Sequence, residues 1–264
     1  MSATTTDPNQ PAHRNEAALL WHQFRYEQLS FWRNPQSAFF TFFFPVVIFV
    51  IFGLIFNDKT PSDFYNGATS MQYYTPTIIA LSVMGACYSQ LAIVLSLRRQ
   101  NGILKRLRAT PLPATTYFLG LLLHCIVLSV VEVVLIAILG KIYGVPMPSK
   151  WGVIAVVLVL GAAAFCALGV AVASLIRNAE AAPALVQFVF FPLVFISGNY
   201  FPIHSSVLNH IADIFPVRPF NQSLLRPFAY NQGFHLQYLL TLAAWGVVGS
   251  LVAIWRFRWD PKPE

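Results

Sequence analysis

Long apolar runs without charged side chains alternate with short polar stretches along most of this chain. Six of these runs are long enough to supply the roughly 20 residues that an α-helix needs to cross a bilayer. Because the runs are apolar on every face, they favour helices over the alternating strands of a membrane barrel. The predicted spans lie at about residues 38–56, 73–96, 114–139, 151–175, 182–200 and 236–256.

Composition agrees with this pattern. The chain has 264 residues, of which 56% are hydrophobic and 10% are charged. Soluble domains contain about 25% charged residues, so an ordinary soluble protein is excluded. Since six such helices leave room only for short connections, we expect one all-α transmembrane domain over residues 37–259.

The three cysteines, Cys87, Cys125 and Cys166, lie in separate apolar runs and form no CxxC pair. We interpret them as small hydrophobic residues, and we expect neither a disulfide framework nor a metal site.

The basic residues predict the orientation of the spans. With six spans, twelve of the 17 Lys and Arg residues fall on the side of the two termini and five fall on the other side. The positive-inside rule then places both termini in the cytoplasm. The first 37 residues contain no apolar core of a cleavable signal, so we expect the first span to be retained.

The flanking segments are predicted from their polarity. Residues 1–13 are expected to be a disordered tail, and residues 260–264 a cytoplasmic tail. In residues 14–36, Trp21, Phe24 and other large apolar residues recur at helical spacing between charges, which predicts an amphipathic helix at the membrane interface. A juxtamembrane stretch anchored by Trp and Arg fits the same residues equally well.

Two connecting segments are distinctive. Residues 97–112 read LRRQNGILKRLRATPL, in which Leu104 and Leu107 give a short helix one apolar face. A plain basic loop on the inner side explains this composition as well. Residues 201–230 are apolar but are interrupted by several prolines, which predicts an external re-entrant segment of short helices.

Candidate chemistry is sparse. The chain contains no phosphate loop, no HExxH and no GxSxG motif, so neither a catalytic site nor an ATP site is expected on it. Glu132 is an acid inside a predicted span, in a run whose other polar groups are His124 and Ser129. A carboxyl group at this depth is costly, which makes it a functional candidate; a structural hydrogen bond to another helix is the alternative.

Large flexible or aromatic residues in the second and fifth spans are candidates for lining an apolar cavity, although contact with lipid or with the helix core accounts for them too. Together with Glu132, the candidates for a substrate path are Tyr74, Met84, Tyr88, Phe188, Phe191, Phe195 and Asn199.

The basic segment and the stretch SGNYFP at residues 197–202 give a resemblance to a known family. The first follows the pattern ExGTLERL and ATPL that is typical of ABC-2 permeases, with Gln100 in place of the acid and Ile103 in place of Thr. The second resembles the SGxxFP pattern of the same family. The chain therefore resembles the membrane subunit of a type V ABC exporter of the drug and antibiotic-resistance kind, over about residues 14–259.

The resemblance implies how such a protein works. Two permease copies would form a homodimer, and each would bind a cytoplasmic ABC ATPase subunit that holds ATP and Mg²⁺; no cofactor is expected on this chain and no nucleic acid partner. Residues 14–36 would be the connecting helix and residues 97–112 the coupling loop. The residues expected to meet the ATPase are Arg99, Gln100, Gly102, Leu104, Lys105, Arg106, Leu107, Thr110 and Pro111.

The predicted function is therefore efflux by alternating access. A Phe-rich wall favours a hydrophobic or amphipathic substrate, such as a drug, a secondary metabolite, a lipid or a lipid-linked glycan. The alternative is a stand-alone, proton-coupled secondary transporter that uses Glu132 and His124. A membrane enzyme acting on lipids ranks last, because Asp and His do not cluster at one membrane face.

Overall fold

The chain is mainly helical. The computed structural model describes residues 16–56, 58–198, 200, 206–257 and 259. Within them the only pairing of extended backbone is an isolated bridge between Ser62 and Ala68, and no strand occurs. This confirms the all-α prediction. The tails predicted at residues 1–13 and 260–264 lie outside the described residues.

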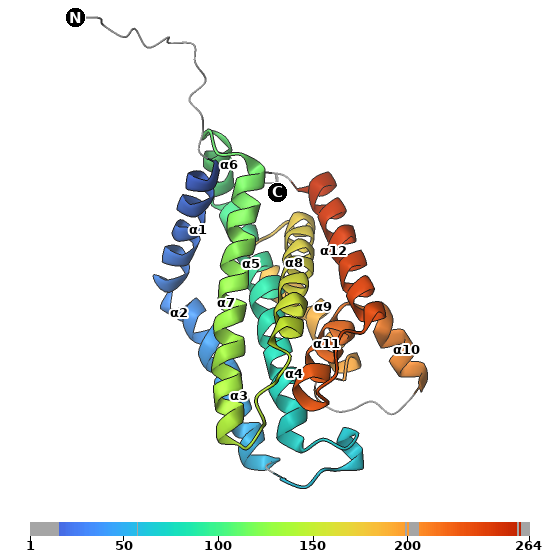
Figure 1. Ribbon diagram of the computed structural model, residues 1–264. Coiled ribbons are helices and arrows are strands. Elements are labelled where there is room, and N and C mark those ends of the chain that lie inside the picture. The colour runs from blue at the N-terminus through green and yellow to red at the C-terminus, as the bar shows by residue number, and fades with distance from the viewer. Residues whose placement is uncertain (1–15, 57, 199, 201–205, 258, 260–264) are drawn as a thin grey trace, which may run out of the picture.

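Five helical segments in the described part of the chain are long and apolar enough to cross a membrane (Figure 1). Three are single helices: α7 (Ala114–Ile142), α8 (Trp151–Leu175) and α12 (Leu236–Arg256). The segment Pro35–Ile55 joins α2 (Pro35–Ala38), the π-turn η1 (Phe39–Phe43) and α3 (Phe44–Ile55). The segment Ser70–Gln100 joins α4 (Ser70–Met84), the π-turn η3 (Gly85–Gln90) and α5 (Leu91–Gln100).

The sixth apolar run is shorter than the sequence predicts. Helix α9 (Ala182–Ile196) has 15 residues, which is about 22 Å of helix against a hydrocarbon layer of about 30 Å. It ends at Ser197, and Gly198 follows with φ of 80°, a conformation that stops a helix. The structure thus gives five helices of spanning length where six are expected.

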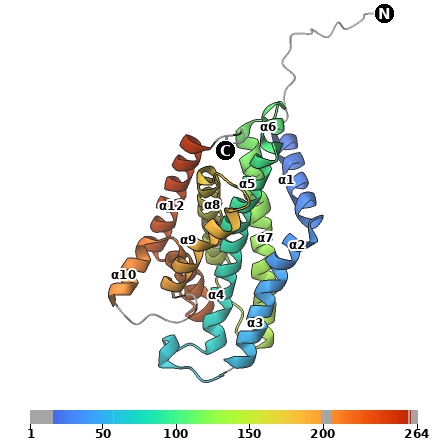
Figure 2. The same cartoon turned by 180° about the vertical axis from the view of Figure 1, so that it is seen from behind.

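The basic segment and the first helix lie together. Helix α1 (Glu16–Trp32) packs along α7. Helix α6 (Ile103–Arg108) lies at the end of the bundle where both α1 and α7 begin (Figures 1 and 2). Gly120 of α7 permits the close approach, because a Cβ there would lie 2.6 Å from Cγ of Gln23. Helix α1 buries Gln23, Glu27 and Phe31 and leaves Trp21 exposed.

Two short helices precede α12. Helix α10 (Ser206–Ile214) ends where the indole Nε1 of Trp245, midway along α12, donates to the Ile214 carbonyl at 2.7 Å. Helix α11 (Val217–Ala229) then packs between α4, α8 and α12. Its Phe220 ring occupies the space over Gly161, where a Cβ would come within 2.1 Å of the ring. Helix α11 therefore starts at mid-height of the bundle.

The other end of α11 reaches one end of the bundle. Tyr230 donates through its hydroxyl to the Tyr65 carbonyl at 3.0 Å, and the Ser149 hydroxyl donates to Oδ1 of Asn231 at 2.7 Å. These partners belong to the connections from α3 to α4 and from α7 to α8. Helix α6, the start of α1 and the end of α12 lie at the opposite end (Figures 1 and 2).

Candidate functional site

The turn between α5 and α6 presents a basic surface. Gly102 adopts φ of 68°, which turns the chain sharply into α6. Within α6, the side chain of Leu104 is fully buried, while the side chains of Lys105 and Arg106 are exposed. The Thr110 hydroxyl donates to the Leu107 carbonyl at 2.6 Å and closes the turn that leads to the exposed Pro111. Helix α6 is thus a short, basic, outward-facing element with an apolar anchor.

A buried ion pair ties this turn to α1 and α7. Both terminal nitrogens of Arg98 donate to the Glu27 carboxylate, at 2.8 and 2.7 Å, and the Arg98 Nη1 also lies 3.2 Å from the Tyr117 hydroxyl. The Gln23 amide donates to the same carboxylate at 2.7 Å. A two-pronged pair of this kind fixes the relative orientation of its helices and is costly to break when buried.

The next two residues tie the turn to the end of α8. Arg99 donates through Nη1 to the Ala173 carbonyl at 2.8 Å and through Nη2 to the Ile176 carbonyl. It thereby satisfies carbonyl groups that the last turn of a helix leaves free, and its charge matches the negative end of the helix. The Gln100 side-chain oxygen accepts from the Ala179 amide at 2.9 Å.

These contacts place Arg99 inside the chain, whereas Gln100 stays exposed beside it. Arg99 is only 3% exposed, so it acts inside this chain and offers no surface to a second subunit. We name Glu27, Arg98, Arg99 and Gln100 the anchor cluster. The sequence analysis missed Glu27 and Arg98 as members, although Glu27 is one of two acids in the first helix and Arg98 is the first basic residue of the basic segment.

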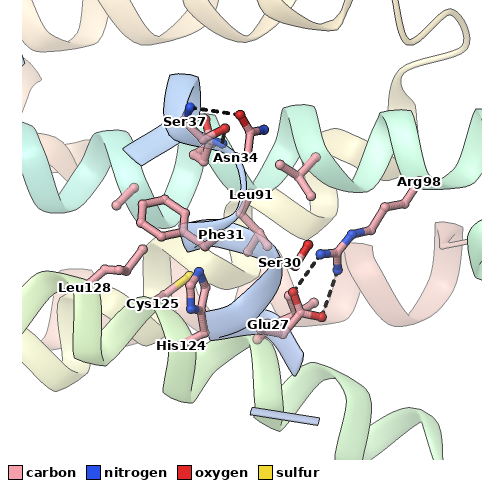
Figure 3. A pocket seen from close by; sticks show the side chains of 14 residues that line it. Glu27, Ser30, Phe31, Asn34, Ser37, Leu91, Arg98, His124, Cys125 and Leu128 are labelled. Atoms are coloured by element: carbon pink, nitrogen blue, oxygen red, sulfur yellow. Dashed lines mark hydrogen bonds and ion pairs between the residues drawn. The ribbon is translucent and has the colours of Figure 1, made fainter. Parts of the chain in front are cut away.

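A cavity of about 130 Å³ lies beside the anchor cluster, between α1, α5 and α7 (Figure 3). Glu27 and Arg98 form its charged side, and Phe31, His124 and Cys125 form its opposite side. The rings of Phe31 and His124 are 5.4 Å apart, and Nδ1 of His124 has no hydrogen-bond partner among the described residues. The cavity is therefore amphipathic.

A second hollow of about 570 Å³ lies at the same end of the bundle. It separates the first turns of α1 from the segment that follows α6. Its lining includes Leu19, His22, Tyr26, Leu107, Pro111 and Leu112.

The structure divides the predicted substrate-path residues into two groups. Tyr74, Met84, Tyr88 and Glu132 are buried inside the chain. Phe188, Phe191 and Phe195 lie on the outer face of α9, with Phe188 77% exposed. Tyr88 of the first group stacks on Phe190 of α9, with ring centroids 5.9 Å apart. Asn199 lies outside the described residues.

Glu132 and the cysteines form the least expected feature. Glu132 is 1% exposed, and neither carboxyl oxygen has a hydrogen-bond partner in the described part of the chain. The sulfur atoms of Cys87, Cys125 and Cys166 lie within 4.8 Å of one another. Their burial as free thiols agrees with the interpretation of the cysteines as small hydrophobic residues, but the meeting of their sulfur atoms was not expected. Their convergence depends on helix packing, which the sequence spacing does not reveal.

The apolar helices and the exposed basic turn define a multi-pass membrane protein. A family model described as ABC-2 type transporter matches residues 18–228. The chain therefore belongs to the ABC-2 type transporter family, and it is the membrane component of an ABC-type transporter, a role in transport and not in catalysis. No curated protein matches the chain. The family does not favour the stand-alone, proton-coupled alternative.

Proposed function

We propose that the chain is the permease subunit of an ATP-driven exporter. Two copies form a homodimer, and each copy binds a separate cytoplasmic ATPase subunit that holds ATP and Mg²⁺. The observation that carries this proposal is the anchored basic turn. Lys105 and Arg106 face outward, while Arg98 and Arg99 join the same turn to α1, α7 and α8.

The anchor cluster gives this turn a mechanical role. A short helix that hung from a flexible loop would absorb a push from a partner, because the loop would bend first. Here the ion pair to Glu27 and the hydrogen bonds to Ala173 and Ala179 resist that bending. Closure of the ATPase subunits against α6 then moves three helices at once and shifts the permease between inward-open and outward-open states.

The hollow between α1 and the segment after α6 supports the position of the ATPase. It is open, lies beside the exposed Lys105 and Arg106, and is lined by apolar Leu107 and Leu112. An apolar hollow on the same short segment as exposed basic side chains suits an acidic, partly apolar surface of a partner subunit. The predicted residues Leu107, Thr110 and Pro111 all belong to this surface.

The proposed topology has six crossings with both termini in the cytoplasm, in the cell membrane. Helix α9 makes the fifth crossing. Helix α6 and the end of α12 then lie on the cytoplasmic side, at the same end of the bundle (Figure 1). Helices α10 and α11 form an external re-entrant pair. The contact of Phe220 with Gly161 and the bond from Tyr230 to Tyr65 support this, because α11 reaches from mid-height to the end opposite α6.

Impermeant maleimide labelling in intact cells tests this topology. In a chain without its native cysteines, Asn231→Cys is expected to label from outside, whereas Asn101→Cys is expected to label only after permeabilisation. Both positions are exposed and lie at opposite ends of the bundle. Labelling of Asn101→Cys in sealed cells would overturn the orientation.

The proposed substrate is hydrophobic or amphipathic, as for a drug, a secondary metabolite, a lipid or a lipid-linked glycan. Phe188, Phe191 and Phe195 give α9 an apolar, aromatic outer face. In a homodimer in which α9 faces the second permease copy, two such faces enclose an apolar path along the dimer axis. The export of such compounds would make the transporter a contributor to antibiotic resistance.

Purification of the complex from native membranes in mild detergent tests the proposal. We expect a soluble protein with a phosphate loop to co-elute, and ATP hydrolysis by the complex to disappear when the Lys of that loop is replaced. A candidate hydrophobic substrate is expected to stimulate the hydrolysis. Repeated elution of the chain alone, without ATPase activity, would contradict the proposal.

A further inference from the structure

Three thiol groups from three membrane-spanning segments meet near the middle of the bundle. Cys87 belongs to η3, Cys125 to α7 and Cys166 to α8, and they are all of the cysteines in the chain. Each is buried and free, and the three sulfur atoms lie within 4.8 Å of one another. We name them the trithiol cluster.

The backbone around the trithiol cluster is specialised. Cys87 lies on a π-turn, a rare helical form that often marks a functional position. Gly169 of α8 lets this turn approach closely, because a Cβ there would lie 3.0 Å from the Cys87 carbonyl oxygen. Ser129 donates to the Cys125 carbonyl at 2.8 Å, and its hydroxyl lies 3.5 Å from the Cys87 sulfur.

An unpartnered acid accompanies the cluster. Glu132 lies on α7 seven residues after Cys125, which places it two turns along the same face. Both of its oxygens lack a hydrogen-bond partner among the described residues, and a buried polar group in that condition usually serves a ligand or a proton.

The cluster also has a route of access. Cys125 and His124 line the cavity of about 130 Å³ between α1, α5 and α7 (Figure 3). The charged side of that cavity is formed by Glu27 and Arg98, at the end of the bundle that carries α6. Cys125 is therefore the member of the cluster that this cavity reaches.

The donor set identifies the chemistry. A metal ion held by three sulfur ligands at about 2.3 Å brings those sulfurs to roughly 4 Å from one another, so a small inward movement of the three side chains completes the site. Soft thiolate ligands select Cu⁺ or Zn²⁺ among the biological metals. Structural Zn²⁺ takes four ligands, whereas the trithiol cluster supplies three.

We propose that Cys87, Cys125 and Cys166 form a buried, three-sulfur binding site for Cu⁺. Each cysteine that binds as a thiolate releases its proton to bulk water, so Cu⁺ binding to all three releases up to three protons. The bound ion joins the second, third and fourth apolar segments at mid-height. The site does not depend on the proposed export function.

Anaerobic titration of the detergent-purified, reduced chain with Cu⁺ tests the site, with bicinchoninate as the competing ligand. We expect one Cu⁺ per chain and an X-ray absorption spectrum with sulfur ligands only. Cys87→Ser, Cys125→Ser and Cys166→Ser are each expected to weaken binding by more than the roughly 10- to 100-fold that changes outside the ligand shell cause. Glu132→Gln, which keeps a neutral polar group of the same size outside the ligand shell, is expected to leave the stoichiometry at one Cu⁺ per chain.

Met71→Leu is the matched control, because it removes a buried sulfur in the first turn of α4, sixteen residues before Cys87. It is expected to bind Cu⁺ as the unsubstituted chain does. The elution volume and melting temperature of each Ser variant show that it is folded. Binding by the unsubstituted chain that does not exceed binding by the triple Ser variant would overturn the proposal. So would nitrogen or oxygen ligands to Cu⁺, or a disulfide in the anaerobically purified chain.

Discussion

The anchor cluster and the outer face of α9 are two regions with opposite character. The anchor cluster is polar and largely buried, with only Gln100 exposed, and its side chains find their partners within the chain: Arg98 pairs with Glu27, and Arg99 bonds to the Ala173 carbonyl. The face of α9 is aromatic and exposed, with Phe188 at 77%. One region is complete in a single chain, whereas the other needs lipid or a second protein surface to cover it. Changes in the first should therefore alter the stability of the chain, and changes in the second should alter its assembly.

The largest effect is expected from breaking the buried ion pair. Glu27→Ala leaves the charge of Arg98 buried without its partner, which costs about 3–5 kcal/mol of unfolding free energy. Thermal unfolding of the detergent-purified chain measures the loss. Replacement of both residues by Met is expected to recover most of it, since an apolar pair leaves no unpaired charge. Equal destabilisation by the single and the double variant would show that the ion pair is not the cause.

A smaller loss is expected when the bond from the turn to α8 is removed. Arg99→Ala deletes charge-assisted hydrogen bonds to two carbonyl groups at the end of α8, each of a kind that contributes about 1.5–3 kcal/mol. Thermal unfolding of the detergent-purified chain measures this loss. Arg106→Ala is the control, because it removes a basic side chain that is exposed. A change at Arg99 no larger than that at Arg106 would mean that the bonds to α8 carry little energy.

The face of α9 is expected to behave differently. Phe188→Ser should change the unfolding free energy of the chain by less than about 0.5 kcal/mol, because the side chain has few internal contacts. It should weaken association of two copies, which sedimentation in detergent measures. Ile138→Ser, at an exposed position of α7, is the matched control. Unchanged association of the Phe188 variant together with a loss in the Ile138 variant would place the interface elsewhere.

The sequence predicts the helices better than it predicts their partners. Runs without charge reveal five long helices, because a spanning helix must be apolar along its whole length. The length of α9 is overestimated, since hydropathy continues past Gly198 although the helix does not. Leu104 and Lys105 are assigned to opposite faces of the basic segment by spacing alone, and the structure places them so.

Long-range contacts are where sequence reasoning fails. From the sequence, Arg99 cannot be told apart from the exposed basic residues around it. Its side chain is buried because the end of α8 lies where Arg99 can donate to the Ala173 carbonyl. Cys87, Cys125 and Cys166 are far apart along the chain, and only the packing of three segments brings their sulfurs together. Both failures have one physical reason: the rotation of each helix about its axis is set by its neighbours, and not by its own composition.

The most direct test of the coupling role is charge reversal on α6. In the complex with its ATPase subunit, transport per ATP hydrolysed is measured in inside-out vesicles for the double variant Lys105→Glu and Arg106→Glu. The control is Lys59→Glu with Lys141→Glu, two exposed lysines at the opposite end of the bundle. Because opposed like charges cost several kcal/mol, transport by the α6 variant should fall at least about tenfold, with normal amounts in the membrane and an unaffected control. Transport by the α6 variant at the level of the unsubstituted chain would contradict the account.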